Sequence, residues 1–204
     1  MAIKAENIGL CGAHRVGKTT LAQALSAATS VPFTRTNTTG VFDSNEIDPA
    51  MPMTFQTRLA IQYRILAAAE ELWAQQNAAF VTDRTPIDMA AYTLADVQGS
   101  TAVEYEAFQS YIDLCFETTN RFFGTLVLVQ PGIPLVYEHG KAALNEAYIE
   151  HINTLILGLC HDERLRCPVV CLKRDITSIK ERVNTVTHHL SPRITVRGIS
   201  KSDH

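Results

Sequence analysis

The chain has 204 residues, of which 46% are hydrophobic and 19% charged, and its formal net charge is −3. These values favour one globular domain with a core that needs no disulfide or metal staple, and they argue against an extended basic surface for nucleic acid. The sequence shows neither a bilayer-spanning apolar run nor a signal peptide, so we expect a cytoplasmic protein that does not enter membranes.

Short apolar runs alternate with longer segments of helical periodicity along the chain. The expected strands are Asn7–Cys11, Val31–Thr36, Ala79–Thr82, Thr125–Gln130 and Val169–Lys173. The expected helices are Lys18–Ala28, Thr54–Gln76, Pro86–Asp96, Val103–Asn120, Lys141–Leu159 and Ile176–His188. This alternation is typical of an α/β protein, and we predict a five-stranded parallel sheet with helices on both faces. We expect one domain over residues 1–190 and a flexible polar tail over 191–204.

The segment after the first strand has the pattern of a phosphate-binding loop. The stretch GAHRVGKT begins at Gly12 and lies between an apolar strand and a helix. Its glycines let successive backbone N–H groups turn inward, and the helix N-terminus adds a partial positive charge. Lys18 can reach the terminal phosphates, and the Thr19 hydroxyl can ligate Mg²⁺. We therefore expect ATP and Mg²⁺ as cofactors, held by Gly12, Ala13, His14, Arg15, Val16, Gly17, Lys18, Thr19 and Thr20.

The helix expected at Thr54–Gln76 carries a polar residue on its apolar face. Helical spacing places Gln62 on one face with an apolar stripe, and Arg58 at the edge of that face. The stripe consists of Phe55, Leu59, Leu66 and Trp73. A buried amide needs hydrogen-bond partners, so Gln62 either bonds neighbouring backbone or lines a pocket and reads the edge of a nucleobase. The nearby phosphate loop favours the pocket.

An acid and a guanidinium follow the strand expected at Ala79–Thr82. Asp83 comes directly after the apolar run and Arg84 follows it. Open α/β sheets bind ligands at the carboxyl ends of their strands, where an acid beside the phosphate loop lies near Mg²⁺ or its water. Arg84 could hold an anionic group there. Thr85 and Asp88 have the spacing of a helix N-cap and its capping-box partner, and we interpret both as mainly structural.

The five cysteines are typical of a reducing compartment. Cys11 and Cys171 lie in apolar, strand-like runs, which predicts core thiols. Cys160, His161 and Cys167 do not have the spacing of a common zinc site, so we expect no zinc there.

Three of these features together resemble the thymidylate kinases and the phage-type deoxynucleoside and deoxynucleotide kinases. The loop with Arg15 two places before Gly17 is similar to the thymidylate-kinase form G-x-D-R-x-G-K. The stretch DRTPID followed by AAY is similar to the D-R-[ST] element of both groups, and the helix carrying Gln62 resembles the base-reading helix of deoxynucleoside kinases. The order of elements agrees over residues 7 to 188. This resemblance implies a P-loop NTPase fold.

The resemblance also implies a role for each matching residue in phosphoryl transfer. Lys18 and the loop backbone would hold the β- and γ-phosphates, and Thr19 would hold Mg²⁺. Arg15 would bridge donor and acceptor, and Asp83 would bind the metal's water or the acceptor hydroxyl. The expected catalytic residues are therefore Lys18, Asp83, Arg15 and Arg84, with Thr19 and Asp83 at the metal. The expected acceptor-binding residues are Phe55, Arg58, Gln62, Arg84 and Lys141.

The chain departs from the thymidylate-kinase pattern at His14, where that family has an acid that touches the acceptor sugar. A related subgroup in bacterial viruses phosphorylates 5-hydroxymethyluracil within DNA during thymidine hypermodification. His14 and the basic tail are compatible with that acceptor, whose flipped base offers a hydroxymethyl arm. It is our most specific expectation for the substrate, and the protein would then act in the cytoplasm of a bacterial host.

Other functions remain open from the sequence. A free deoxynucleoside or deoxynucleoside monophosphate would suit the same residues. A nucleotide-sensing switch with slow hydrolysis, using residues 36–52 as its switch segment, and a nicotinamide-riboside-type kinase share the architecture. A homodimer is also left open.

Overall fold

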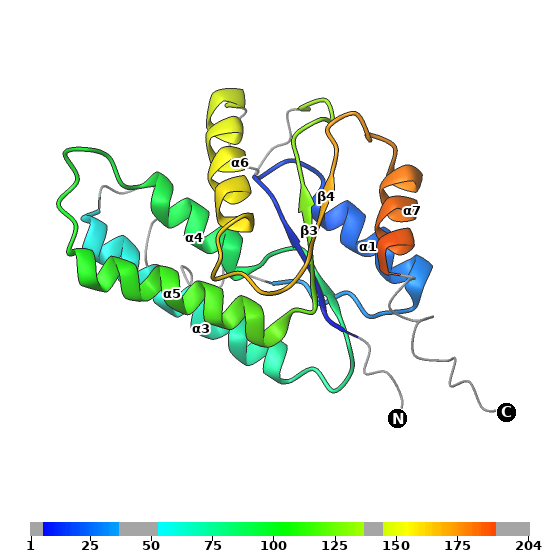
Figure 1. Cartoon of the computed structure of the whole chain (residues 1–204), viewed down its shortest axis with the longest axis horizontal. Helices are drawn as coiled ribbons and strands as arrows, with labels where there is room; N and C mark the ends of the chain where they lie inside the picture. Colours follow the sequence, from blue (N-terminus) through cyan, green and yellow to red (C-terminus); the bar gives the residue numbers. More distant parts are fainter. Residues whose placement is uncertain (1–5, 37–52, 137–144, 191–204) are drawn as a thin grey trace, which may run out of the picture.

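A computed structural model of the chain describes residues 6–36, 53–136 and 145–190 (Figure 1). Four parallel strands form one sheet in the order β2-β1-β3-β4. The strands are β1 (Ile8–Cys11), β2 (Val81–Thr82), β3 (Thr125–Val129) and β4 (Val169–Leu172). The helices are α1 (Lys18–Thr29), α3 (Phe55–Ala74), α4 (Pro86–Ala95), α5 (Tyr105–Phe122), α6 (Glu146–Cys160) and α7 (Ile179–Leu190).

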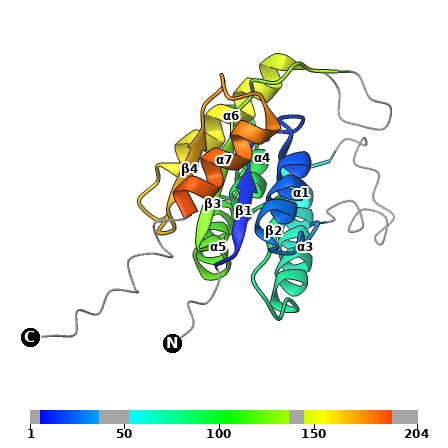
Figure 2. The ribbon, with the colours of Figure 1, turned by 90° about the vertical axis from the view of Figure 1, so that its right-hand side faces the viewer.

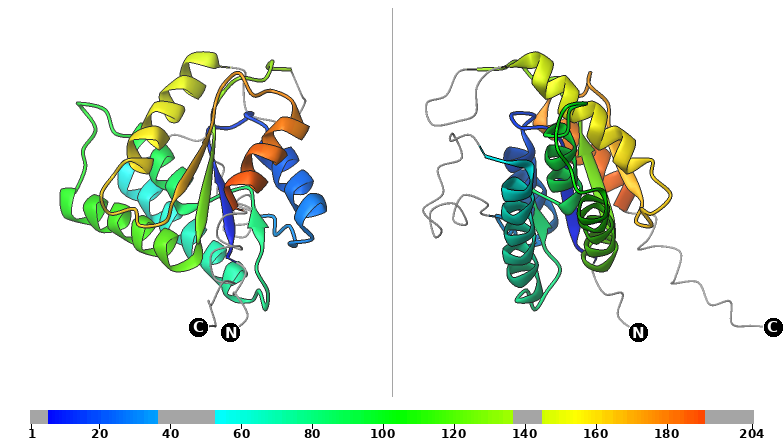
Figure 3. Two further views of the ribbon diagram at one scale, coloured as in Figure 1. Left: turned by 45° about the vertical axis from the view of Figure 1, so that its right-hand side comes forward. Right: turned by 90° about the vertical axis from the view of Figure 1, so that its left-hand side faces the viewer.

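Helices cover both faces of the sheet, as the alternating pattern predicts. Helices α1 and α7 pack together on one face (Figure 2), and α3, α4, α5 and α6 cover the other (Figure 3). Every residue of β1 and β3 is buried as a consequence, which explains their continuous apolar sequences. Ile8 to Cys11 of β1 pair in register with Thr125 to Leu128 of β3, so the two strands end side by side next to the loop that starts at Gly12.

The stripe predicted on the long helix belongs to the core. Phe55, Leu59, Leu66 and Trp73 are all buried in α3. The Trp73 ring lies 5.1 Å from the Phe123 ring, centroid to centroid, at an edge-on angle of 78°. Such aromatic contacts join α3 to the start of β3 and fix the helix against the sheet.

The expected fifth strand is reduced to an isolated bridge. Phe33 pairs with Val81 in parallel, and two backbone hydrogen bonds, Thr34 N–H to Val81 O and Val81 N–H to Pro32 O, accompany that pairing. The segment 31–36 thus lies beside β2 at the edge of the sheet. Since β2 itself comprises two residues, it offers little backbone for a longer ladder.

Two other expectations differ from the structure. Cys171 is exposed rather than a core thiol, because β4 alternates between buried and exposed positions and its Sγ accepts a hydrogen bond from Gln130 Nε2 at 3.2 Å. Helix α6 begins at Glu146, and the expected start at Lys141 lies outside the described residues, as do the segment 37–52 and the tail 191–204. The boundary of the domain at residue 190 stays a prediction.

Within the described parts of the chain, no helix combines the length and the apolarity that crossing a bilayer requires.

Gly9 gives a direct test of the packing between β1 and its neighbours. A Cβ added there would lie 2.6 Å from Thr85 Cγ2 and 2.9 Å from Phe123 Cδ1, so Gly9→Ala should lower the free energy of unfolding by about 1–3 kcal/mol through overpacking. Chemical denaturation measures the difference. Gly99→Ala is the matched control, because nothing lies within 4 Å of a Cβ at Gly99. Equal stabilities of the two variants would contradict the packing.

Candidate functional site

The loop between β1 and α1 has the backbone conformation of an anion cradle. Gly12, Arg15 and Gly17 have φ values of 154°, 63° and 87°. A side chain at Gly12 would overlap the carbonyl oxygen of Val129, so only glycine fits between the loop and β3. Arg15 adopts its left-handed conformation without the freedom of a glycine, which costs about 1–2 kcal/mol and marks the loop as constrained by its surroundings.

The N-terminus of α1 points its backbone N–H groups into this loop. The helix begins after Gly17 with no side-chain cap and with no acidic residue in its first turn. The first N–H groups of a helix have no partner inside the helix, and they carry the positive end of its dipole. The sequence therefore leaves these donors available for an anion from outside the helix.

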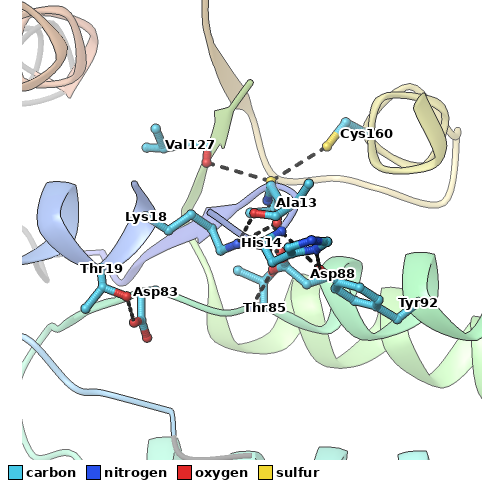
Figure 4. A network of polar contacts seen from close by, with 12 residues as sticks. Ala13, His14, Lys18, Thr19, Asp83, Thr85, Asp88, Tyr92, Val127 and Cys160 are labelled. Carbon is cyan, nitrogen blue, oxygen red and sulfur yellow. Dashed lines mark hydrogen bonds and ion pairs between the residues drawn. The ribbon is translucent and has the colours of Figure 1, made fainter. Parts of the chain in front are cut away.

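The Lys18 ammonium lies inside the loop. Its Nζ donates to the carbonyl oxygens of Gly12 and Ala13, at 2.5 and 2.8 Å, and lies 3.8 Å from Asp88 Oδ1 (Figure 4). Burial lowers the pKa of Lys18 from its ordinary value, and the Arg84 cation lowers it further, whereas the Asp88 carboxylate opposes both. The Lys18 amine thus lies at the centre of the cradle, between two loop carbonyls and the Asp88 carboxylate.

Asp88 has a second role that its sequence position did not reveal. The predicted capping box is confirmed, since Asp88 Oδ2 accepts from both the N–H and the hydroxyl of Thr85, each at 2.8 Å. Its other oxygen accepts the N–H of Gly12 at 2.9 Å. The side chain is 1% exposed, so one buried carboxylate caps α4 and fixes the first residue of the phosphate loop.

Thr19 and Asp83 meet beside the cradle, and their predicted shared role at a metal stays a prediction. The Thr19 hydroxyl donates to Asp83 Oδ2 at 2.6 Å, while Asp83 Oδ1 is buried and has no hydrogen-bond partner among the described residues. A buried carboxylate oxygen without a partner destabilises the fold unless a ligand binds it. Mg²⁺ prefers such oxygen ligands and completes its shell with phosphates and water, so this pair fits it without a protein cage. In the described residues, no three His, Cys, Asp or Glu side chains gather as a metal cluster.

His14 is held between two tyrosines from different helices. Its backbone N–H donates to the Tyr92 hydroxyl at 3.0 Å, and its Nδ1 lies 3.1 Å from the same oxygen. The ring of Tyr148 on α6 lies 5.7 Å from the imidazole, centroid to centroid. Burial raises the pKa of Tyr92 to about 12, so its hydroxyl stays neutral and can accept from the loop at any physiological pH.

The two predicted arginines, Arg84 and Arg15, lie in different surroundings. Arg84 is half-buried and near enough to Lys18 and Tyr92 to lower the pKa of both. Its guanidinium forms no hydrogen bond or ion pair with any described residue, so its donors are available. Arg15 donates from Nη1 to the carbonyl oxygen of Val136 at 2.9 Å and is thereby tied to the chain that follows β3.

A cavity of about 310 Å³ lies where the predicted acceptor residues meet the end of α4. Phe55 and Arg58 line it together with Asp96, and Arg58 Nη1 lies 3.2 Å from Asp96 Oδ1. Its remaining lining residues are Met53, Ala95, Gln98 and Thr101. Burial raises the pKa of Asp96, and the Arg58 guanidinium opposes this shift.

Gln62, another predicted acceptor residue, is not among the described residues that line this cavity. Gln62 is half-buried one turn further along α3, does not line the cavity and forms no hydrogen bond with a described residue. Its role as a base reader stays a prediction. Lys141 lies outside the described residues. Asp96, by contrast, was not predicted from the sequence. Its position eight residues after Asp88, at the C-cap of α4, is the signal that could have found it.

One protein-family model matches the part of the chain that contains this site. The model AAA_28, described as an AAA domain, matches residues 7–123, more than half of the chain. The chain belongs to the AAA_28 family. The match includes the phosphate loop, Asp83 and the cavity residues, so the P-loop NTPase-like fold predicted from the sequence is confirmed. No curated protein sequence matches this AAA_28 protein.

Solved structures with this fold include several nucleoside and nucleotide kinases. Deoxyadenosine kinase from M. mycoides with dCMP and a flexible dCDP bound is 17% identical, with a TM-score of 0.61 over 92% of this chain and 99% of that one. Thymidylate kinase from Ehrlichia chaffeensis is 15% identical, with a TM-score of 0.59 over 92% and 100%. NadR in complex with NR is 14% identical, with a TM-score of 0.64 over 98% of this chain and 53% of that one.

Asp88→Asn tests the link between α4 and the loop. An asparagine presents one acceptor where the carboxylate has two, so either Gly12 N–H or the Thr85 donors lose their partner. We expect the free energy of unfolding to fall by about 1–3 kcal/mol and nucleotide affinity to fall with it. Denaturation and ATP titration measure the two effects.

Glu163→Gln is the control for Asp88→Asn, because Glu163 is exposed and forms no hydrogen bond or ion pair with a described residue. Wild-type stability together with wild-type ATP affinity in Asp88→Asn would disprove the link.

Proposed function

We propose that this AAA_28 protein is an ATP-dependent kinase that transfers the γ-phosphate to a nucleoside or nucleotide acceptor. The observation that carries the proposal is the contact between Thr19 and Asp83 beside the cradle, which leaves one Asp83 oxygen buried and unpaired. An NTP-binding loop alone would serve a switch as well. The half-buried, unpaired Arg84 and the cavity at Arg58 and Asp96 add an acceptor side to the site and favour the kinase.

The donor side uses the loop and its cations. The uncapped start of α1 and the left-handed turns at Arg15 and Gly17 present backbone N–H groups to the phosphates, and Lys18 would exchange its loop carbonyls for phosphate oxygens. Thr19 and Asp83 would hold Mg²⁺ beside the polyphosphate, and the ion would neutralise charge that develops in transfer. Phosphoryl transfer depends mainly on positioning and electrostatic stabilisation, which these groups supply.

The acceptor side would bring a hydroxyl or phosphate oxygen to Arg84. The acceptor oxygen forms a bond to the γ-phosphorus as the bond from that phosphorus to the β–γ bridging oxygen breaks, and ADP leaves. Where the acceptor is a hydroxyl, its proton passes to Asp83 or to water. Arg84 and Arg15 would stabilise the charge on the transferred group, and Arg15 is tied to Val136 on the same side.

The body of the acceptor would occupy the cavity at the far end of α4. Phe55 offers an aromatic edge there, and the Arg58–Asp96 pair offers both donors and acceptors. That combination can discriminate the polar edge of a nucleobase, because a mismatched base would leave a partly buried charge unpaired. Gln62 would act one turn further along the same helix.

A deoxypyrimidine is the acceptor class that we favour, with 5-hydroxymethyluracil in phage DNA as its most specific member. Support for the DNA-borne base comes from His14, whose ring lies between Tyr92 and Tyr148 at the position where thymidylate kinases have a sugar-binding acid. A base presented from DNA requires no free sugar hydroxyl at that point. A free deoxynucleoside or its monophosphate is the second candidate, and the deoxynucleotides bound to the deoxyadenosine kinase of the same fold support it. The homodimer and the cytoplasmic location stay predictions.

The chemical roles are tested by Lys18→Ala and Asp83→Asn. Each variant should lower the rate of phosphoryl transfer by about 10²–10³-fold, because it removes a group that stabilises charge in the transition state. Transfer from γ-labelled ATP measures the rate, and circular dichroism verifies the fold. Asp175→Asn on the exposed loop after β4 is the control and should keep full activity. Near-normal transfer by Asp83→Asn would remove its role.

The acceptor is identified by a panel of deoxynucleosides, their monophosphates, nicotinamide riboside and 5-hydroxymethyluracil DNA. We expect a labelled deoxypyrimidine product, and Arg58→Ala should raise the KM for that acceptor about tenfold or more while the KM for ATP stays unchanged. A labelled product from no member of the panel would refute the kinase proposal. If the wild type gives a labelled product but Arg58→Ala leaves the KM for the acceptor unchanged, only the role of the cavity is refuted.

A further inference from the structure

Arg182 is a buried cation that the proposed mechanism does not use. It lies on α7, is 2% exposed, and pairs with no carboxylate among the described residues. Together with Val186 it forms the buried face of that helix, which packs against α1. A lone buried guanidinium is costly, so its position needs an explanation in terms of what it contacts.

The Arg182 guanidinium joins the phosphate loop to the segment before α7. Its Nη1 donates to the carbonyl oxygen of Val16 at 2.9 Å, and its Nε donates to the carbonyl oxygen of Ile176 at 2.7 Å. Val16 lies 166 positions away in the sequence, in the middle of the loop. The planar fork of the side chain therefore fixes one loop carbonyl relative to the C-terminal helix.

The direction of the Val16 carbonyl decides the direction of the next N–H group. A trans peptide is planar, and its C=O and N–H point to opposite sides. With the Val16 oxygen turned toward Arg182, the N–H of Gly17 is turned away from α7. Gly17 is in the left-handed conformation with φ 87° and ψ 23°, and directly precedes the uncapped start of α1. The bond from Arg182 thus fixes the direction of the Gly17 N–H at the start of α1.

The charge of Arg182 also favours a bound polyphosphate. Burial lowers its pKa from the ordinary value, yet an arginine stays protonated in proteins. No described carboxylate balances the charge, and a bound polyphosphate would do so from the other side of the loop. Position and charge thus both favour the nucleotide-bound state.

We propose that Arg182 is a positioning residue of the phosphate cradle, which sets the Val16–Gly17 peptide for polyphosphate binding through its bond to the Val16 carbonyl. The proposal deepens the proposed function and rests on ATP being bound by this loop. It assigns Arg182 no contact with the phosphates. The polyphosphate part of the ligand is therefore the part whose affinity depends on Arg182.

The test compares Arg182→Met and Arg182→Lys with the wild-type chain in titration calorimetry with Mg²⁺, using ATP and inorganic tripolyphosphate as separate ligands. Arg182→Met removes the donors, and Kd for both ligands should rise about 10–100-fold. Arg182→Lys keeps the charge but cannot bond both carbonyls, so its affinities should lie between those of the wild type and those of Arg182→Met. If Arg182→Met does not fold, Arg182→Lys alone carries the comparison.

Val186→Ala is the matched control, because Val186 is fully buried one turn further along α7 and does not contact the loop carbonyl. Its side chain has no donor for the Val16 carbonyl, so Val186→Ala should lower the melting temperature while leaving both Kd values within about twofold of the wild type. An equal loss of affinity in Val186→Ala and Arg182→Met would overturn the proposal, and so would an Arg182→Met or Arg182→Lys variant that binds tripolyphosphate as the wild type does.

The two proposals fail in different experiments. A wild-type chain that binds neither ATP nor tripolyphosphate would refute the proposed function and, with it, the role of Arg182. A wild-type chain that binds both but phosphorylates no acceptor would refute the kinase alone, and the affinities of the Arg182 variants would still decide the role of that residue.

Discussion

The hydrogen bonds of the Asp88 carboxylate are the constraint on which the site depends. One oxygen bonds Thr85 at the start of α4, and the other bonds Gly12 at the end of β1. Because Asp83 and Arg84 directly precede Thr85, fixing the start of α4 against the loop also fixes the distance from these two side chains to the cradle. A residue that would serve as an ordinary helix cap elsewhere aligns the two halves of the site here.

The balance of charge around the cradle follows from this arrangement. Lys18, Arg84 and Arg182 are buried or half-buried near the loop, and Asp83 and Asp88 are the carboxylates in contact with it. Asp88 lies 3.8 Å from the Lys18 ammonium, so its carboxylate compensates part of this positive charge. The cations lie where the backbone also presents donors, which suits a polyphosphate, and Asp83 adds a carboxylate that suits a metal ion.

Local patterns in the sequence predicted the parts of this site whose geometry is local. The phosphate loop, the capping box and the buried stripe of α3 each depend on residues within a few turns of one another. Contacts between distant segments were not predictable in this way. The bond from Asp88 to Gly12 spans 76 positions and that from Arg182 to Val16 spans 166, and neither residue carries a signature that distinguishes it from a cap or from a surface arginine. The missing fifth strand and the exposed Cys171 have the same origin, because both depend on how far neighbouring elements extend along the sheet edges.

Helix α4 connects the two ends of the proposed reaction. Asp88, Tyr92 and Asp96 lie four residues apart, and this spacing places them on one face of the helix. They contact Gly12, His14 and Arg58 in turn, so this face runs from the first glycine of the cradle to the cavity. The rise of a helix over eight residues is about 12 Å. Since a helix is stiff, this face would set the separation between the transferred phosphate and the body of the acceptor in the proposed reaction. In the proposed reaction this face would select an acceptor by its length as well as by its polar edge. His14, which Tyr92 holds midway along the face, would lie between the transferred phosphate and the body of the acceptor.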